Sequence, residues 1–201
     1  MIDKSDIVYV EISKEELNIC IDNAKKISFS IDDRKDLHDR DILERFNNVL
    51  MGEVAEQMVI KWLKNNGKFA ESTVNKGSSS PDKGHDVLVR GLNGRNVFCS
   101  VKSSLSALYD TQKIIEKFKL ATKKSELSDI NIQVYFWLTI SPKDRNSNRI
   151  TVPSITQSAI IGWFGKRDID SFTTYNHENR EVPNSILQNA RSMQSLLRMI
   201  E

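Results

Sequence analysis

Asp86 and Lys102 are the residues with the clearest chemical potential, and they lie in the stretch 81–104, PDKGHDVLVRGLNGRNVFCSVKSS. Apolar and polar residues alternate on both sides of the GLNG turn, whose Gly and Asn residues tolerate the positive φ that tight hairpins need. A turn centred near Asn93 places Asp86 opposite Ser100. Because side chains repeat with a period of two, both residues share one face with Lys102. The pattern predicts a β-hairpin with an acid and a lysine at the polar end of one face.

An acid beside a lysine suits phosphodiester hydrolysis, which needs an activated water and stabilisation of negative charge on phosphorus. Carboxylates that hold Mg²⁺, together with a lysine ammonium, can supply both. Further carboxylates come from Glu53 and Glu56, which lie one turn apart in a helical pattern. Each of these residues alone is most simply a surface charge. Their combination favours a catalytic site.

The elements that position these residues follow from hydrophobic periodicity and stop signals. Asp41 is a candidate N-cap for a long helix that ends at the Asn-Asn-Gly of 65–67. The other predicted elements are a strand at 7–12, a helix at 13–26, a strand at 69–74, a loop at 75–84, a helix at 105–127, a buried strand at 130–140, shorter strands at 150–155 and 159–164, and a final helix from about 184 to 200.

The order helix, strand, hairpin, helix, strand predicts an α/β core with a central mixed β-sheet flanked by helices. The 201 residues suit a single domain, 1–201, with a core over about 41–165 and helical additions at both ends. No apolar run reaches about 18 residues and no secretory signal is visible, so we expect a cytoplasmic protein without membrane contact. Two cysteines without a CxxC pair exclude a zinc knuckle and a disulfide framework.

Several other functional classes lack their motifs. The chain has no GxxxxGK[ST] phosphate loop, no GxGxxG dinucleotide fingerprint and no GxSxG nucleophile elbow. Cys99 belongs to the apolar set of the hairpin, so we expect it to be packed rather than nucleophilic. A net charge of +2 is too small to indicate a nucleic-acid partner by itself.

The sequence resembles the PD-(D/E)xK nuclease superfamily, the fold of many restriction endonucleases and Holliday junction resolvases. The resemblance rests on GEVAE at 52–56, GHDV at 84–87 and VKSS at 101–104, and it covers roughly 41–140. It implies a restriction-endonuclease-like fold that hydrolyses DNA with Mg²⁺, or with Mn²⁺ as an alternative ion. A restriction or defence setting, a double-stranded DNA substrate and a homodimer are part of that expectation.

The resemblance also implies roles for individual residues. Asp86 matches the aspartate that binds Mg²⁺, and Lys102 matches the lysine that orients or activates water and offsets charge on the phosphate. Glu56 matches the helix glutamate that completes the site, with Glu53 as a neighbouring candidate ligand. The Pro-Asp pair could instead be 81–82, but Asp86 begins an alternating strand and faces Lys102.

Ser100 departs from the family pattern, which places an acid two residues before the lysine. A serine hydroxyl is a poor Mg²⁺ ligand compared with a carboxylate. The acid could have migrated to Glu56 or Glu53, the protein could bind without cutting, or the serine could be an introduced inactivating substitution. The second reading defines an alternative function, a catalytically inactive DNA-binding or regulatory protein on the same fold. A structural or partner-binding protein without DNA affinity is a third.

Residues expected to contact nucleic acid lie in loops and at strand ends near the hairpin. Such loops often carry ligand contacts, and arginines suit guanine edges and phosphates equally. The candidates are Lys83, His85, Ser103, Ser104, Arg145 and Arg149.

Overall fold

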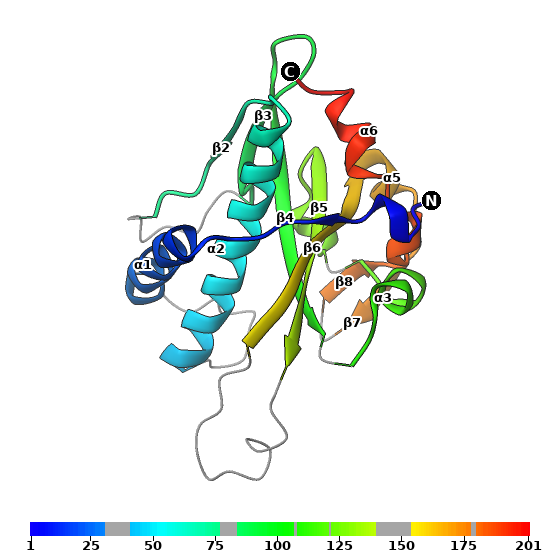
Figure 1. Cartoon of the computed structure of the whole chain (residues 1–201). Coiled ribbons are helices and arrows are strands. Elements are labelled where there is room, and N and C mark those ends of the chain that lie inside the picture. The colour runs from blue at the N-terminus through cyan, green and yellow to red at the C-terminus, as the bar shows by residue number, and fades with distance from the viewer. Residues whose placement is uncertain (31–40, 77–83, 107, 121, 140–153, 178–179) are drawn as a thin grey trace.

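The structure is a computed structural model of the chain (Figure 1). It describes residues 1–30, 41–76, 84–106, 108–120, 122–139, 154–177 and 180–201. Among these residues, no helix combines the length and the apolar character needed to cross a bilayer.

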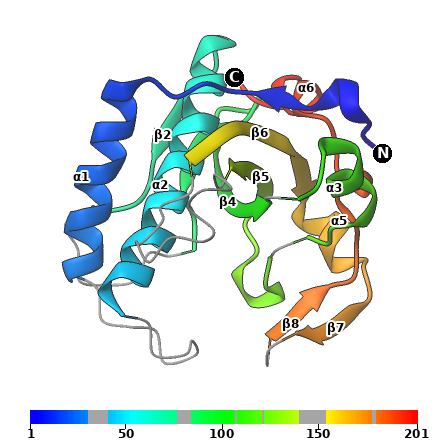
Figure 2. The same ribbon diagram turned by 60° about the horizontal axis from the view of Figure 1, so that its bottom comes forward.

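A curled mixed sheet of six strands, counted over the described residues, forms the centre of the molecule (Figure 2). Its strand order is β1-β6-β5-β4-β3-β2. β4 and β5 run parallel, and all other neighbouring strands in this sheet are antiparallel. The strands are β1 (Val8–Tyr9), β2 (Ala70–Ser72), β3 (Val87–Arg90), β4 (Asn96–Ser106), β5 (Ile130–Thr139) and β6 (Ser154–Gly165).

The two sides of this sheet carry different elements. Figure 2 shows α1 and α2 on one side, and α3, α5 and the β7–β8 hairpin on the other. Their bounds are α1 (Lys14–Ser30), α2 (Ile42–Asn65), α3 (Thr111–Lys117), α5 (Lys166–Asp170), α6 (Met193–Leu197), β7 (Thr174–His177) and β8 (Arg180–Pro183). Single 3₁₀ turns are η1 (Lys4–Asp6), η2 (Lys124–Glu126) and η3 (Leu187–Asn189).

The long helix α2 forms where the sequence predicts it. The Asp41 carboxylate accepts a hydrogen bond from Glu44 N at 2.8 Å, which satisfies one of the unpaired N–H groups of the first turn. At the other end, Gly67 takes a φ of 72°, and Lys68 N donates to Leu63 O at 3.0 Å. This left-handed residue ends the helix as the Asn-Asn-Gly signal indicates.

The hairpin β3–β4 also has the predicted register, since Val87 pairs with Cys99. Cys99 and Val101 belong to the hydrophobic core cluster that contains Val54 and Met58 of α2. Because side chains alternate along a strand, the residues between and after them turn to the opposite face of the sheet. The face of β4 that carries Ser100 and Lys102 therefore lies away from α2.

The helix predicted over 105–127 is wrong for most of its length. β4 occupies its first residues, and α3 covers only Thr111–Lys117. The backbone of Phe118 is extended, and Leu120 N donates to Ser185 O at 2.9 Å. Pairing with a distant segment thus replaces the local helical preference.

The helix predicted from about 184 to 200 is wrong in the same way. Only the short η3 and α6 form there. Between them, Arg191 exchanges two backbone hydrogen bonds with Trp163 of β6, at 2.8 and 3.0 Å. The strand predicted at 159–164 forms as part of the longer β6, and most of the one predicted at 150–155 lies outside the described residues.

Candidate functional site

Asp86 lies at the start of β3 and is held in place by three hydrogen bonds to the backbone of its neighbours. Its N–H donates to Cys99 O at 2.9 Å, and its carbonyl accepts from Thr73 N at 3.0 Å. Its carboxylate Oδ2 accepts from Val101 N at 2.6 Å. The acid is therefore fixed beside β4, at the residue that precedes Lys102.

Lys102 lies on β4 with its ammonium 3.4 Å from Oε2 of Glu126, which belongs to η2. The other oxygen of the same carboxylate lies 3.3 Å from the ammonium of Lys123. All three side chains are less than one third exposed, at 28% for Lys102, 22% for Glu126 and 15% for Lys123. Glu126 thus bridges two lysines, and partial burial strengthens both interactions relative to water.

Ser100 lies in the middle of this polar face and is fully buried. Its hydroxyl has no hydrogen-bond partner among the described residues. A buried hydroxyl without a partner costs free energy, so such groups are rare and often mark a site that binds something else.

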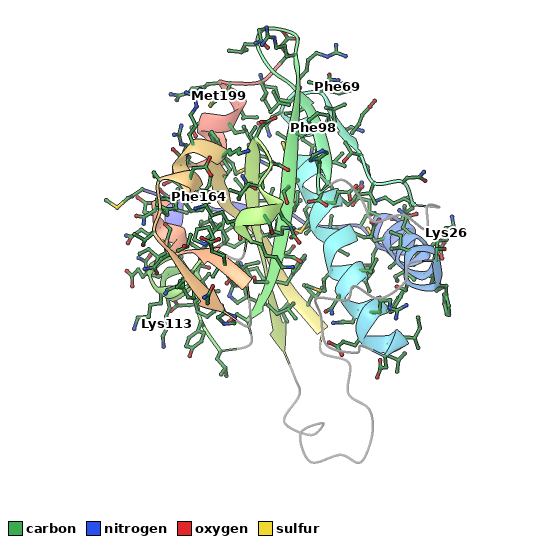
Figure 3. All side chains as sticks on the ribbon, turned by 180° about the vertical axis from the view of Figure 1, so that it is seen from behind. Lys26, Phe69, Phe98, Lys113, Phe164 and Met199 are labelled. Atoms are coloured by element: carbon green, nitrogen blue, oxygen red, sulfur yellow. The ribbon has the colours of Figure 1, made fainter. Side chains whose placement is uncertain are left out.

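Polar side chains continue from β4 onto the neighbouring parallel strand. Asn131 pairs with Ser100 and Gln133 pairs with Lys102 in the register of β5. Asn131 exchanges two hydrogen bonds with the backbone of Ser128, at 2.8 and 3.2 Å, and Gln133 donates to the Thr122 hydroxyl at 3.3 Å. The chain around η2 therefore covers this strip, and Figure 3 shows η2 in front of the central strands when the molecule is seen from behind.

His85, a predicted nucleic-acid contact, packs beside this strip. Its ring lies 4.5 Å from the ring of Phe98, which Figure 3 labels on the hairpin, and its Nδ1 lies 3.4 Å from the Ser128 hydroxyl. The Ser128 hydroxyl also donates to Gly84 O at 3.1 Å. These contacts hold the His85 ring against Phe98 and Ser128 just before β3.

Glu53 and Glu56 form a separate cluster with Lys76. The Lys76 ammonium lies 2.6 Å from Glu53 Oε1 and 3.0 Å from Glu56 Oε2, and Asn23 of α1 donates to Glu53 Oε2 at 3.1 Å. Both carboxylates are deeply buried, with exposed fractions of 7% for Glu53 and 6% for Glu56. Two buried acids therefore share one ammonium.

Burial sets the acid–base behaviour of this cluster. It raises the pKa of Glu56, although the nearby Lys76 charge opposes that effect. For Lys76, burial disfavours the charged form, but the carboxylates of Glu56 and Glu53 outweigh burial and raise its pKa. Lys76 is consequently a firmly charged counter-ion for the helix acids.

The structure brings Asp86 and Lys102 to the same end of the hairpin, whereas the helix acids pair with Lys76. Glu53 contacts Lys76 and Asn23, and Glu56 contacts Lys76 and the side chain of Ser72 on β2. Lys102 contacts Glu126. Within the part of the chain that is described, no group of three or more His, Cys, Asp or Glu side chains is arranged to hold a metal ion. Coordination of a metal ion by Glu53 or Glu56 stays a prediction.

The remaining predicted residues divide into two groups. Ser103 and Ser104 lie on β4 and are half-buried. Asp82, Lys83, Arg145 and Arg149 lie outside the described residues.

Sequence reasoning missed Glu126, which lies 24 positions from Lys102. No motif or periodicity signals it, because its position depends on the path of the connection between the parallel strands. It also missed Lys76, at the edge of the loop predicted over 75–84. No residue pattern around Lys76 indicates that it contacts Glu53 and Glu56.

Both cysteine thiols are buried. Burial, followed by the charges of Glu53 and Glu56, raises the pKa of Cys20 to about 11. Burial also raises the pKa of Cys99 well above its usual range. A thiolate nucleophile is therefore disfavoured at either position, as expected for Cys99.

Comparison of the chain with protein-family models, with curated proteins and with solved structures found no match. The functional assignment therefore rests on the residues and their geometry.

Proposed function

We propose that this chain is a metal-dependent DNA endonuclease of the PD-(D/E)xK type, with its site at the open end of the β3–β4 hairpin. The element order α2, β2, β3, β4, α3, β5 supports the proposal. This order agrees with the helix, strand, hairpin, helix, strand order expected from the sequence. Double-stranded DNA is the proposed substrate in a restriction or defence setting, and a homodimer would allow both strands to be cut.

The observation that carries the proposal is the 2.6 Å hydrogen bond from Val101 N to Asp86 Oδ2. It fixes a carboxylate beside the strand that bears Lys102. An acid ordered in this way is prepared for a metal ion, because little reorganisation is needed on binding.

The donor chemistry fits a hard divalent cation. Carboxylate oxygens are the ligands that Mg²⁺ prefers. The Asp86 carboxylate accepts a hydrogen bond from Val101 N of β4, and the Glu126 carboxylate contacts the Lys102 side chain of the same strand. When bound, Mg²⁺ supplies charge stabilisation at phosphorus and acidifies the attacking water. The Lys102 ammonium, partly exposed, would offset the negative charge that develops on the phosphate. Its contact with Glu126 keeps it ordered before substrate binds.

A specific observation supports a second candidate, a catalytically inactive DNA-binding or regulatory protein on the same fold. Position 100 carries no acid, and its hydroxyl lacks a partner in the described structure. The helix acids that could compensate are already paired with Lys76. This candidate predicts DNA affinity that falls with salt, without cleavage.

The test is cleavage of supercoiled plasmid and of short duplex DNA with Mg²⁺ or Mn²⁺. The variants are Asp86→Asn and Lys102→Met, and the matched controls are Asp170→Asn and Lys166→Met, at exposed positions of α5. We expect each site variant to lose at least about 100-fold in rate while the controls cut normally.

Two results would contradict the nuclease proposal. They are no cutting by the wild-type protein with either ion, or equal cutting by Asp86→Asn. Salt-dependent DNA binding without cutting would favour the second candidate. Absence of DNA binding at low salt would exclude both the nuclease and the DNA-binding protein.

A further inference from the structure

The face of β4 that lacks an acid at position 100 receives one from a different segment. Glu126 reaches it from η2 and contacts the Lys102 ammonium at 3.4 Å. A glutamate at position 100 would lie two residues from Lys102, on the same face. Glu126 thus brings a carboxylate to Lys102, the residue beside which an acid at position 100 would have stood.

The helix acids are less suited to this task. Side-chain alternation turns Lys102 away from α2, the helix that carries Glu53 and Glu56. Both acids also pair with Lys76, at 2.6–3.2 Å. Recruiting one of them for a metal ion would break an ion pair of a carboxylate that is only 7–8% exposed, compared with 22% for Glu126, which makes it the more costly choice.

Ser100 gives independent evidence for a ligand on this face. Its hydroxyl is buried, shares the face of Lys102, and finds no partner among the described residues. Hydroxyls of this kind are satisfied when water or an ion enters the site. The neighbouring amides of Asn131 and Gln133 are already hydrogen-bonded to Ser128 and Thr122.

We propose that Glu126 supplies the metal-binding carboxylate that position 100 lacks, and that it acts with Asp86 on one divalent cation. This inference rests on the proposed function and identifies the ligands of the metal ion. Asp86 and Glu126 supply two carboxylates, the ligands that a hard divalent cation prefers. Lys102 and Lys123 hold Glu126 in place until the ion binds.

The test measures Mn²⁺ binding directly, by electron paramagnetic resonance of the intact protein without DNA. Glu126→Gln should weaken Mn²⁺ affinity by about tenfold or more, and Asp86→Asn should do the same. Glu116→Gln, the same substitution at an exposed position of α3, is the matched control and should bind as the wild type does. Glu126→Asp keeps the carboxylate on a shorter side chain and should lie between the wild-type protein and Glu126→Gln.

Glu56→Gln tests the rival ligand in the same assay and should leave Mn²⁺ affinity unchanged. Circular dichroism and the thermal midpoint confirm that each variant is folded. The inference is overturned if wild-type protein binds no Mn²⁺, or if Glu126→Gln binds it normally.

A cleavage assay separates this inference from the proposed function. If the wild-type protein and Glu126→Gln cut DNA equally while Glu56→Gln does not cut, the helix supplies the acid and only the inference fails. If Mn²⁺ binding depends on Glu126 but no DNA is cut, the ligand assignment stands and the nuclease proposal fails.

Discussion

The Lys76 ammonium lies 2.6 Å from Glu53 Oε1 and 3.0 Å from Glu56 Oε2, so one lysine pairs with two acids of the same helix. These acids are among the most buried charged side chains of the described structure. Without a counter-ion, two carboxylates in such a place would repel each other and lack solvation.

We therefore expect Lys76→Met to lower the free energy of unfolding by about 2–3 kcal/mol at pH 7.5, because it leaves buried charges unpaired. Urea unfolding followed by circular dichroism measures the change. The matched control is Lys25→Met, since Lys25 pairs with Asp22 at 3.6 Å on the surface of α1. That variant should change stability by less than about 0.5 kcal/mol. Equal effects of the two substitutions would show that the Lys76 cluster is not a stabilising ion pair.

The raised pKa of Glu56 gives a second prediction, on the pH dependence of stability. Because burial raises the pKa in the folded state, the folded protein binds more protons than the unfolded chain in the window above pH 4.5. The contribution of Glu56 is fully present below that pH and is lost as the pH rises through its folded pKa. Glu56→Gln removes this titration, so its stability relative to the wild type should rise between pH 4 and pH 8. A relative stability that falls over this range would contradict the sign of the shift.

The two thiols allow a third prediction. Burial and the nearby acids raise the pKa of Cys20 to about 11, and burial raises that of Cys99 further. At pH 8 the thiolate fraction of Cys20 is then roughly 100-fold below that of an ordinary thiol. Ellman's reagent should react slowly with both thiols in the native protein and rapidly with both in urea. Fast reaction of either thiol in the native state would show that it is more accessible than this structure indicates.

Local signals account for the parts of the fold that were predicted correctly. The Asp41 cap and the stop at Gly67 bound α2, and alternation with a Gly-Asn turn sets the pairing of Val87 with Cys99. These features depend on residues close together in the sequence. Period-two alternation also predicts correctly that Ser100 and Lys102 share a face away from the core residues Cys99 and Val101.

The errors arise where distant segments pair. Leu120 and Arg191 lie in segments with helical patterns, yet their backbones bond to Ser185 and Trp163. The same reason explains why Glu126 and Lys76 were not predicted as site residues. The sequence shows that acids and lysines are present, but tertiary contacts decide which acid meets which lysine.

The unpartnered hydroxyl of Ser100 leads to a fourth prediction. Removing a buried polar group that makes no hydrogen bond relieves its desolvation cost, so Ser100→Ala should raise the free energy of unfolding by about 1 kcal/mol in the absence of divalent ions. Ser106→Ala is a control at a hydroxyl on the same strand, because Ser106 Oγ accepts from Tyr109 N at 3.2 Å. That variant should be destabilised. Loss of stability on Ser100→Ala without metal would show that the hydroxyl is already satisfied.

Restoring an acid at position 100 provides the fifth prediction. Ser100→Glu should place a carboxylate on the face of Lys102, where a divalent cation can bind it together with Asp86. Ser100→Gln has nearly the same shape without the charge, and both substitutions should lower stability in metal-free buffer because position 100 is fully buried. Since a ligand that binds only the folded state raises the thermal midpoint, millimolar Mn²⁺ should stabilise Ser100→Glu more than Ser100→Gln. Differential scanning fluorimetry over a Mn²⁺ titration measures this difference. Equal shifts for the two variants would mean that position 100 does not face a metal site.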